Sequence, residues 1–412
     1  MQQLKIKRTA NSNLQNEINI SVIFNFLRTK GASYRAQISK DLSISAPAVS
    51  RAVEHLIKKG YVLERGRIKT EYGKNASKVM VNPNIGFIVA VDMLKERVRI
   101  AVTDFSGKIR VLYSSFSMTG SRNLQEDLIR EIKNISDKYI HTIKKDARIK
   151  AICLGIPAST NLKTGKINAV LYESLEKFDL KTLLSEAFSV PVYVENIANL
   201  SAIGESSCGR GKDYKEIVFL EISNGIGAGI ISNNTLHRGS SGNAGEIGYS
   251  LIDKDDLDSF RRRKGSLERV ASMDTIVSDM KKELRFGEES ILGNNPEIIE
   301  KIDAASIFNA AVKKDRLAQR IIEKAVKHIA ICATNLILTI DPEIIFIGGD
   351  LYHMPEAEFL FIEPLKNYVR NVLPFEPPVI ELSSLGEDAG IIGASYLAVE
   401  TLLTGKYPYR IE

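Results

Sequence analysis

One segment of the chain, from Ile217 to Tyr249, constrains the fold more than any other. Its apolar runs Ile217–Glu221 and Ala228–Ile231 each have the length of a short buried strand. Between and within them, glycine occupies alternate positions, where a backbone turns or approaches another group closely: Gly225, Gly227 and Gly229. Asn233-Asn234 then has the composition of a hairpin turn. The pattern predicts a β-hairpin that lies close to a ligand or to another backbone.

The same segment ends with a carboxylate held between two glycines, Gly245 and Gly248. A charge in such a position at the end of a hairpin is typical of a ligand contact. The alternative is a salt bridge that locks two parts of the fold together. We expect Glu246 to contact a ligand.

Positive charge is concentrated at the N-terminal end of the chain. Residues 1–83 contain 15 Lys and Arg against 5 Asp and Glu, whereas the remainder is mildly acidic. A basic module on an acidic body indicates a polyanionic partner for the first part only. A solvated surface rich in lysine would have the same composition, so charge alone leaves both interpretations open.

Length and composition are those of ordinary globular domains, and 412 residues suffice for two or three of them. No apolar run reaches the roughly 20 residues of a membrane span. The first residues lack the apolar core of a signal peptide. The cysteines have neither metal nor disulfide spacing: Cys153, Cys208 and Cys332. We expect a cytoplasmic protein with no metal site and no membrane association.

Three helices and a hairpin are predicted in residues 1–83. Apolar residues at every fourth position indicate the buried face of a first helix that ends at Gly31: Leu14, Ile18, Val22 and Phe26. Ser33 suits the N-cap of a short helix over Tyr34–Asp41. After a tight turn, a third helix begins at Ala46-Pro47 and ends before Gly60. Two short strands follow, around the loop 65–77.

This order predicts a winged helix-turn-helix DNA-binding domain, with a boundary at residues 83–84. The exposed N-terminal end of the third helix would enter the major groove, and the basic hairpin would contact phosphate or the minor groove. The candidate DNA-binding residues are Arg35, Ser45, Pro47, Ser50, Arg51, Arg67, Lys69 and Lys74. A helical protein-interaction module with a basic face is the alternative.

The remaining residues, 84–412, repeat one α/β plan. Strands are predicted at 87–92, 98–104 and 109–116, then a helix from Leu124, then a strand at 150–156. The segment from Ile217 begins the same plan again, with helices over 303–340 and a buried strand at 344–347. A pattern that occurs twice predicts two related lobes, and the cleft between such lobes is a common place for a small ligand.

These residues resemble the ROK family of repressors, open reading frames and sugar kinases, and in particular its repressor branch. The most specific matches are Asn224–Gly229, Gly245–Gly248, Gly348-Gly349-Asp350 and the stretch Gly386–Ala394. The resemblance implies an α/β fold of the actin/hexokinase-like (ribonuclease H-like) type. It also implies a sugar bound between the lobes and a helix-turn-helix domain in front of them.

Kinase chemistry needs a general base beside the sugar hydroxyl and a glycine-rich turn for the phosphates. In kinases of the family the base is the aspartate of an Asn-Asp-Ala-Asn motif, and Ile197 occupies that position here. The family's Asp-x-Gly-Gly-Thr turn is replaced by residues 92–97. We therefore expect no catalytic residue, no cofactor, a structural role for Asp92, and glycines that mainly maintain the hairpin.

Sugar recognition is expected to persist. Asn196, Glu246 and Glu268 match the family's sugar contacts, and the weaker candidates are Tyr249, Ser159 and Asn243. A lobe-locking salt bridge is the alternative for Glu246, and a turn amide for Asn196. Related proteins hold a structural zinc, but Tyr249 stands where they have histidine, and residues 259–268 contain no cysteine.

The sequence thus predicts a sugar-responsive repressor that binds a palindromic double-stranded operator as a homodimer or tetramer. A sugar or polyol between the lobes would close them and change the spacing of the DNA-binding domains. A sugar kinase with an unusual base, a repressor controlled by a protein partner, and an activator are the alternatives.

Overall fold

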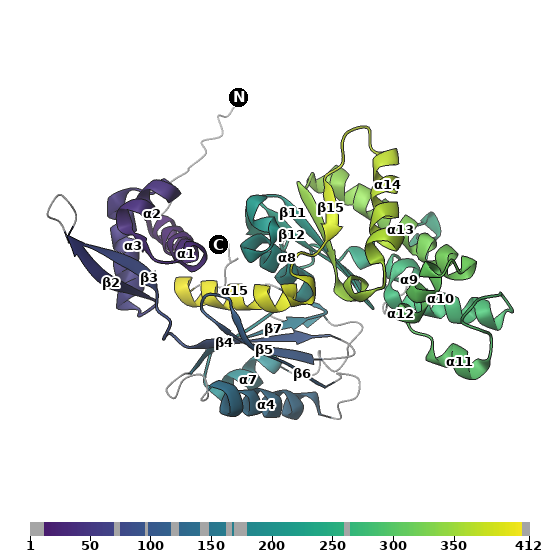
Figure 1. The fold of residues 1–412 in the computed structure, drawn as a ribbon, viewed down its shortest axis with the longest axis horizontal. Helices are drawn as coiled ribbons and strands as arrows, with labels where there is room; N and C mark the ends of the chain where they lie inside the picture. The colour runs from purple at the N-terminus through teal and green to yellow at the C-terminus, as the bar shows by residue number, and fades with distance from the viewer. Residues whose placement is uncertain are drawn as a thin grey trace.

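The structure, a computed structural model, describes residues 12–69, 75–94, 98–116, 123–140, 148–161, 167–168, 179–258 and 264–405. Within these ranges the chain forms an N-terminal helical segment with a hairpin and a body with two β-sheets (Figure 1). No helix among the described residues is long and apolar enough to cross a membrane.

The N-terminal segment contains the three predicted helices and the predicted hairpin. In chain order its elements are α1 (Ser12–Lys30), β1 (Ser33–Tyr34), α2 (Arg35–Leu42), α3 (Ala46–Lys58), β2 (Val62–Lys69) and β3 (Asn75–Val81). β3 lies between β1 and β2 and is antiparallel to both. Pro47 stands in the first turn of α3, where its missing N–H costs no helical hydrogen bond.

Two details of this segment differ from the prediction. Ile18 and Val22 are exposed, and the buried face of α1 consists instead of Ile20, Ile23, Phe24 and Leu27. A strict spacing of four drifts around a helix of 3.6 residues per turn, and α1 is covered on the side that contacts α3 and the body. Ser33 pairs with β3 and caps no helix; Tyr34 is the N-cap of α2.

The first lobe is a mixed five-stranded sheet. Its strands, in the order β10-β7-β4-β5-β6, are β10 (Val192–Asn196), β7 (Ile149–Ile156), β4 (Phe87–Met93), β5 (Val98–Asp104) and β6 (Ile109–Phe116). β7 is parallel to β4 and β10, whereas β5 is antiparallel to both of its neighbours. Helices α4 (Leu124–Ile135) and α7 (Leu180–Phe188) cover one face. A two-stranded pairing of β8 (Ser159–Thr160) with β9 (Ile167–Asn168) follows β7.

The second lobe repeats this plan. Its strands, in the order β13-β12-β11-β14-β15, are β13 (Thr235–Leu236), β12 (Ile226–Ser232), β11 (Ile217–Ile222), β14 (Ile344–Gly348) and β15 (Val379–Leu382). In both lobes the first strand is central, two antiparallel strands extend the sheet on one side, and two parallel strands extend it on the other. The predicted duplication and the actin/hexokinase-like fold are confirmed.

Helices of the second lobe form a layer on the outer face of its sheet. They are α9 (Glu268–Ala271), α10 (Met273–Arg285), α11 (Pro296–Lys301), α12 (Ala304–Val312), α13 (Arg316–Ile340) and α14 (Glu363–Val372). The hairpin turn predicted between β12 and β13 is present. Asn233 and Asn234 both have positive φ, as the two central residues of such a tight turn require.

Two helices, α8 (Ile197–Cys208) and α15 (Ala389–Thr404), pack between the sheets (Figure 1). Alternate residues of β4 explain the layers: Val89 and Val91 face α4 and α7, while Ile88 and Ala90 face α8 and α15. α8 contacts α15 more extensively than any other pair of described elements contact each other.

A buried ion pair connects the lobes beside α8. Arg238, which follows β13, donates through Nε to a side-chain oxygen of Glu195 in β10 at 2.9 Å. Glu195 also accepts from Asn199 Nδ2 at 2.9 Å and from the Asn196 N–H at 2.9 Å. Both members of the pair are about 5% exposed. A salt bridge between the lobes was the alternative role predicted for Glu246, and Glu195 makes such a bridge instead.

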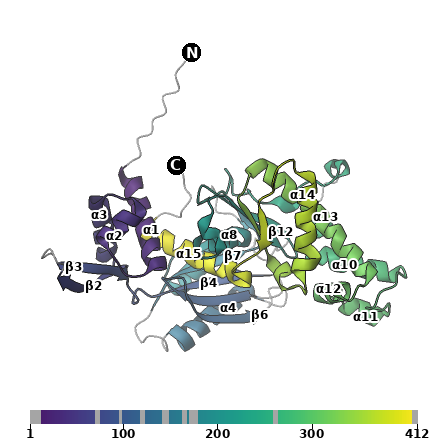
Figure 2. The same ribbon diagram turned by 45° about the horizontal axis from the view of Figure 1, so that its top comes forward.

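The N-terminal segment packs directly on α15 (Figure 2). The Arg28 guanidinium lies 3.2 Å from the centre of the Tyr396 ring, and Ser21 Oγ donates to Glu400 at 3.0 Å. Tyr61 stacks on Phe105 of the first lobe. Burial lowers the pKa of Arg28 to about 10 and raises that of Glu400. Helix α1 and the body thus share one continuous core.

Replacing Arg238 by alanine is expected to destabilise the chain by about 3 kcal/mol, because it leaves Glu195 as a buried charge without its cation. Arg210→Ala is the matched control: it removes an ion pair with Glu381 in which Arg210 is 66% exposed, and should cost at most about 1 kcal/mol. Urea unfolding of the full chain measures both. Equal losses in the two variants would contradict this account of the lobe connection.

Candidate functional site

A cavity of about 290 Å³ opens between the two lobes. Leu94, Pro157 and Asn196 line it from the ends of β4, β7 and β10, and Glu221 and Asp350 line it from the ends of β11 and β14. These are the carboxyl ends of the strands, where open α/β sheets bind ligands.

Three of the six predicted sugar-binding residues line this cavity: Asn196, Glu246 and Glu268. The other three do not. Ser159 is buried in β8, and Asn243 is exposed, with its amide donating to Ser241 Oγ at 3.2 Å. Tyr249 is 42% exposed at the end of a short 3₁₀ turn that follows Glu246.

Glu268 is held by the hairpin that the sequence singled out. One carboxylate oxygen accepts from the Ile226 N–H at 3.1 Å and the other from the Gly265 N–H at 2.9 Å. The side chain is 5% exposed. Backbone donors to both oxygens fix the orientation of the carboxylate, and each oxygen keeps a lone pair for a ligand hydroxyl.

Asn196 has a structural task as well as its place in the cavity. Its Oδ1 caps α8 by accepting from the N–H groups of Ala198, at 2.8 Å, and Asn199, at 3.4 Å. Its Nδ2 donates to the Ala158 carbonyl at 3.2 Å. These three hydrogen bonds agree with the alternative interpretation of Asn196 as a structural amide. One N–H of the amide remains for a ligand.

Glu246 is half-buried, and its pKa is raised by burial and then by the negative charge of Glu268. The same causes, with Glu246 added, raise the pKa of Tyr249. The two carboxyl groups and the phenol therefore form one electrostatic neighbourhood, although the Tyr249 ring does not line the cavity.

The positions at which the family's kinases carry catalytic and phosphate-binding groups have other roles in this structure. Ile197 lines the cavity and offers no group that accepts a proton. Asp92 is 5% exposed and lies 3.9 Å from Arg99, which also pairs with Asp388 at the start of α15. This ion pair supports the structural role expected for Asp92.

The alternate glycines have different environments. Gly225 and Gly227 line the cavity. At Gly229, by contrast, a Cβ would overlap the backbone of Ala198 in α8, so this glycine permits close packing of helix on hairpin. Gly229 therefore serves the packing of α8, while the other two lie at the cavity, and the predicted role of the glycines in the hairpin itself stays a prediction.

Sequence reasoning missed three ionisable residues that line the cavity: Glu221, Asp350 and His353. Asp350 had a signal in the Gly348-Gly349-Asp350 motif, and Glu221 had one as a carboxylate within an apolar strand. The pKa of Glu221 is raised to about 8, chiefly by burial. The Ser223 hydrogen bond acts in the opposite direction, and the charges of Asp92 and Asp350 add to the rise. His353, 3.3 Å from Glu387, had no pattern around it.

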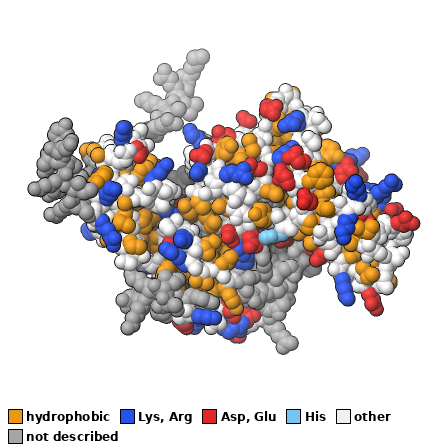
Figure 3. Space-filling view, in the orientation of Figure 1, with side chains coloured by type: hydrophobic (Ala, Val, Ile, Leu, Met, Phe, Trp, Pro, Cys, Tyr) orange, Lys and Arg blue, Asp and Glu red, His pale blue; other side chains and the backbone are white. Residues whose placement is uncertain are grey.

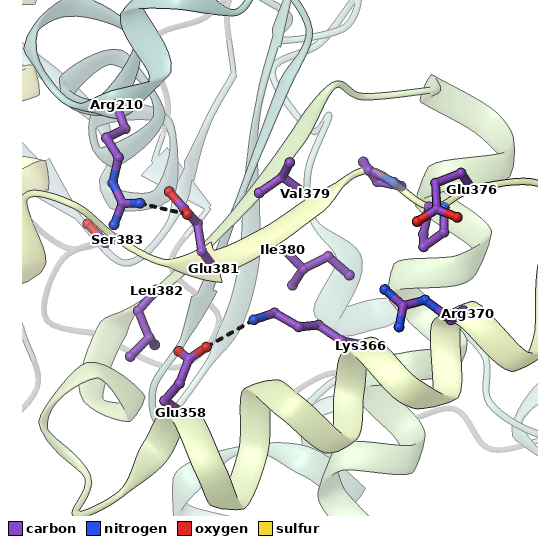
Figure 4. Close-up of a pocket in the computed structure, with 12 residues that line it drawn as sticks. Arg210, Glu358, Lys366, Arg370, Glu376, Val379, Ile380, Glu381, Leu382 and Ser383 are labelled. Carbon is purple, nitrogen blue, oxygen red and sulfur yellow. Dashed lines mark hydrogen bonds and ion pairs between the residues drawn. The ribbon is translucent and has the colours of Figure 1, made fainter.

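A larger groove of about 560 Å³ runs beside the edge strand β15 and α14 (Figure 4). Its charged side chains are largely paired with one another: Arg210 with Glu381 at 2.8 Å, and Lys366 with Glu358 at 3.0 Å. It contains none of the predicted site residues, and the cavity between the lobes is the better candidate despite its smaller size.

No group of three or more His, Cys, Asp or Glu side chains suited to a metal ion occurs among the described residues. Residues 259–263, where relatives were expected to have zinc ligands, lie outside them.

The candidate DNA-binding surface lies on the N-terminal segment. Ser45, Pro47 and Arg51 are exposed at the start of α3, and Ser50 is half-buried there. Arg35 pairs with Glu64 of β2 at 2.8 Å and with Glu54 of α3 at 3.6 Å, which connects the helices to the hairpin.

The rest of this surface is less fully described. The backbone of Arg67 and Lys69 lies in β2, and Lys74 lies outside the described residues. On the face in Figure 3, the charged side chains of the described part of this segment are mostly Lys and Arg, while charges of both signs are mixed over the body.

The raised pKa of Glu221 predicts how the stability of the folded chain depends on pH. Since this pKa is about 8 in the folded chain against an ordinary 4.5, the unfolded chain ionises Glu221 first as pH rises. Wild type therefore loses stability between about pH 4.5 and 8. Glu221→Gln avoids this loss, so its melting temperature should exceed that of wild type increasingly up to pH 8 and by a constant amount above it. The exposed Glu376→Gln should follow wild type; a Glu221→Gln difference independent of pH would contradict the account.

Comparison with known proteins finds a repressor and a sugar kinase among the relatives of this chain. The chain is 26% identical over 398 residues to a xylose repressor of Caldicellulosiruptor bescii, covering 96% of this chain and 98% of that protein. It is 30% identical over 261 residues to a glucokinase of Halalkalibacterium halodurans, covering 62% and 78%.

Among solved structures, a ROK family transcriptional regulator, a homologue of the Escherichia coli MLC protein, superposes with a TM-score of 0.76 at 22% identity. The match covers 95% of this chain and 97% of that one. The model of the ROK family matches residues 88–401. The chain therefore belongs to the ROK family.

Proposed function

We propose that this chain is a sugar-responsive transcriptional repressor without kinase activity. The main support for the proposal is that two features belong to parts of the chain that share one continuous core. An exposed helix end suited to the major groove lies on one side, and a cavity with carboxylates that bind hydroxyls lies on the other. The relatives that match nearly the whole chain include proteins named as repressors.

The N-terminal segment, residues 1–83, is assigned as a winged helix-turn-helix domain. α2 and α3 are joined by a tight turn at Ser43, which has positive φ, and β2 and β3 form the wing. The buried face of α3 packs on α1, so the opposite face, with Arg51, is available to base edges. Arginine in the major groove commonly recognises guanine.

The cavity is assigned to a sugar or polyol effector. Glu246, Glu268 and Asn196 supply two carboxylates and an amide, which suit the several hydroxyls of such a ligand. A kinase is not favoured: Ile197 replaces the base, and Asp92 is engaged with Arg99 instead of facing a nucleotide. No observation favours control by a protein partner over control by a sugar.

The effector acts, in this proposal, by changing the relative position of the lobes. Asn196 at the cavity caps α8, α8 packs along α15, and α15 contacts α1 of the DNA-binding domain. A ligand can shift such an equilibrium only by its difference in affinity for the two arrangements. Closure of the lobes around the sugar would therefore reposition α3.

A homodimer on a palindromic operator completes the proposal. Ile331 and Leu338, seven residues apart on α13, are 49% and 59% exposed, and such apolar side chains on one helix face suit a contact between two copies.

Operator binding is the first test. In fluorescence anisotropy with DNA from upstream of its own and neighbouring genes, the chain should bind tightly, weaken with salt, and be released by one compound of a sugar and polyol panel. Arg51→Ala should weaken binding by about 10-fold or more, whereas Arg210→Ala, on the body, should not. Absence of specific binding at low salt would reject the repressor function; wild-type affinity of Arg51→Ala would reject α3 as the reading helix.

The sugar site has its own test. Glu246→Gln removes a charged acceptor but keeps the shape of the side chain, so it should bind operator normally and need at least about 10-fold more effector for release. Asn243→Ala, outside the cavity, is the control and should respond as wild type does. If Glu246→Gln responds normally to the effector, the sugar lies elsewhere.

A further inference from the structure

The cavity has a second half, which the sugar-matching residues do not explain. It lies where β11 and β14 end and is formed by Glu221, Ser223 and Asp350. Ser223 Oγ donates to Glu221 at 2.9 Å and accepts from the Asp350 N–H at 2.9 Å. We call this group the β11–β14 half. The side chains of Glu221 and Ser223 and the backbone of Asp350 are thus joined before any ligand enters.

The turn between β14 and Asp350 has the glycines of a phosphate-binding turn but lacks the free surface. Gly349 has φ +80°, and a Cβ placed there would lie 2.6 Å from Glu221 Oε1. The Glu221 carboxyl group therefore covers the side of the turn on which glycine leaves room for a ligand. The N–H of Asp350 is already used by Ser223. A phosphate would find neither the space nor the donor that such turns provide.

The charges of the cavity also oppose a phosphate. The ionisable side chains that line it are Glu221, Glu246, Glu268, Asp350 and His353, and no described Lys or Arg joins them. Arg99, behind Asp92, is 2% exposed and is engaged with Asp92 and Asp388. Proteins bind phosphate esters with backbone N–H groups, Arg and Lys. Here a doubly charged phosphate would face carboxyl groups instead.

We infer that the effector is a sugar or polyol without a phosphate group, and that Glu221 and Asp350 reject phosphorylated sugars and nucleotides. This inference rests on the proposed function in one respect, the binding of a sugar in this cavity. Hydroxyl groups are not rejected in the same way, because carboxyl groups and the Ser223 hydroxyl accept and donate hydrogen bonds to them. The β11–β14 half thus determines specificity by excluding anions.

The test compares sugars with their own phosphate esters. Isothermal titration calorimetry of the full chain, without DNA, would use glucose and glucose 6-phosphate, N-acetylglucosamine and its 6-phosphate, further such pairs, and Mg-ATP. We expect each ester to bind at least about 10-fold more weakly than its parent sugar. Mg-ATP should give no binding at millimolar concentration. An ester that binds as tightly as its sugar, or saturable binding of Mg-ATP, would overturn the inference.

Two isosteric variants assign the selectivity to residues. Asp350→Asn removes one ionisable carboxyl group and should reduce the preference for sugar over ester by about 10-fold. Glu221→Gln should reduce this preference above pH 8, where the wild-type Glu221 carboxyl group is ionised. Glu376→Gln removes an exposed acidic side chain of the same lobe outside the cavity and should leave the preference unchanged. An unchanged preference in both cavity variants would contradict the inference that Glu221 and Asp350 reject phosphorylated ligands. Circular dichroism of each variant verifies that it is folded.

Operator binding in the same preparations separates this inference from the proposed function. A chain that is released from operator by a sugar phosphate but not by the parent sugar contradicts the inference and leaves the repressor function intact. A chain that binds no operator, yet prefers sugars to their esters, contradicts the repressor function and leaves the inference intact.

Discussion

The close crossing of α8 over α15 is the contact on which the rest of the structure depends. A Cβ at Gly204 would overlap the Ala389 carbonyl, and a Cβ at Gly393 would overlap the Leu200 carbonyl, so the two backbones touch. Helix α8 also packs on strands of both sheets, and α15 packs on β4 and β7 of the first. At such a short separation the helices can rotate against each other but cannot move apart without opening the core. Both the cavity and the seat of the N-terminal segment are defined relative to this crossing.

Much of the fold could be predicted because its signals are local. The apolar runs of β4, β7, β11 and β14 and the asparagine turn after β12 predicted the correct strands and the duplication of the lobes. The buried face of α1 could not be found in this way. Which side of an amphipathic helix is covered depends on its neighbours, and α1 rests on α15, nearly 400 residues later in the chain.

The candidate site was predictable to the extent that its residues match motifs of the ROK family. Glu246, Glu268 and Asn196 do line one cavity. Glu221 could not be assigned, because a carboxylate at a strand end has no function until the neighbouring strand brings Gly349 beside it. The ion pair of Glu195 with Arg238 has the same origin: its partners lie on different lobes, 43 residues apart, with no shared pattern.

The seat of the N-terminal segment on the body has a mechanical consequence for the proposed function. Arg28 under the Tyr396 ring, Ser21 on Glu400 and Tyr61 on Phe105 fasten the domain to the body at three separate points. A segment held at three points is not on a flexible tether. In the proposed function it would act as the long arm of a lever whose fulcrum is the helix crossing. A rotation too small to disturb the packing at the fulcrum becomes a larger displacement at the tip of α3. Two such arms on one duplex would then be in or out of phase with successive turns of the DNA.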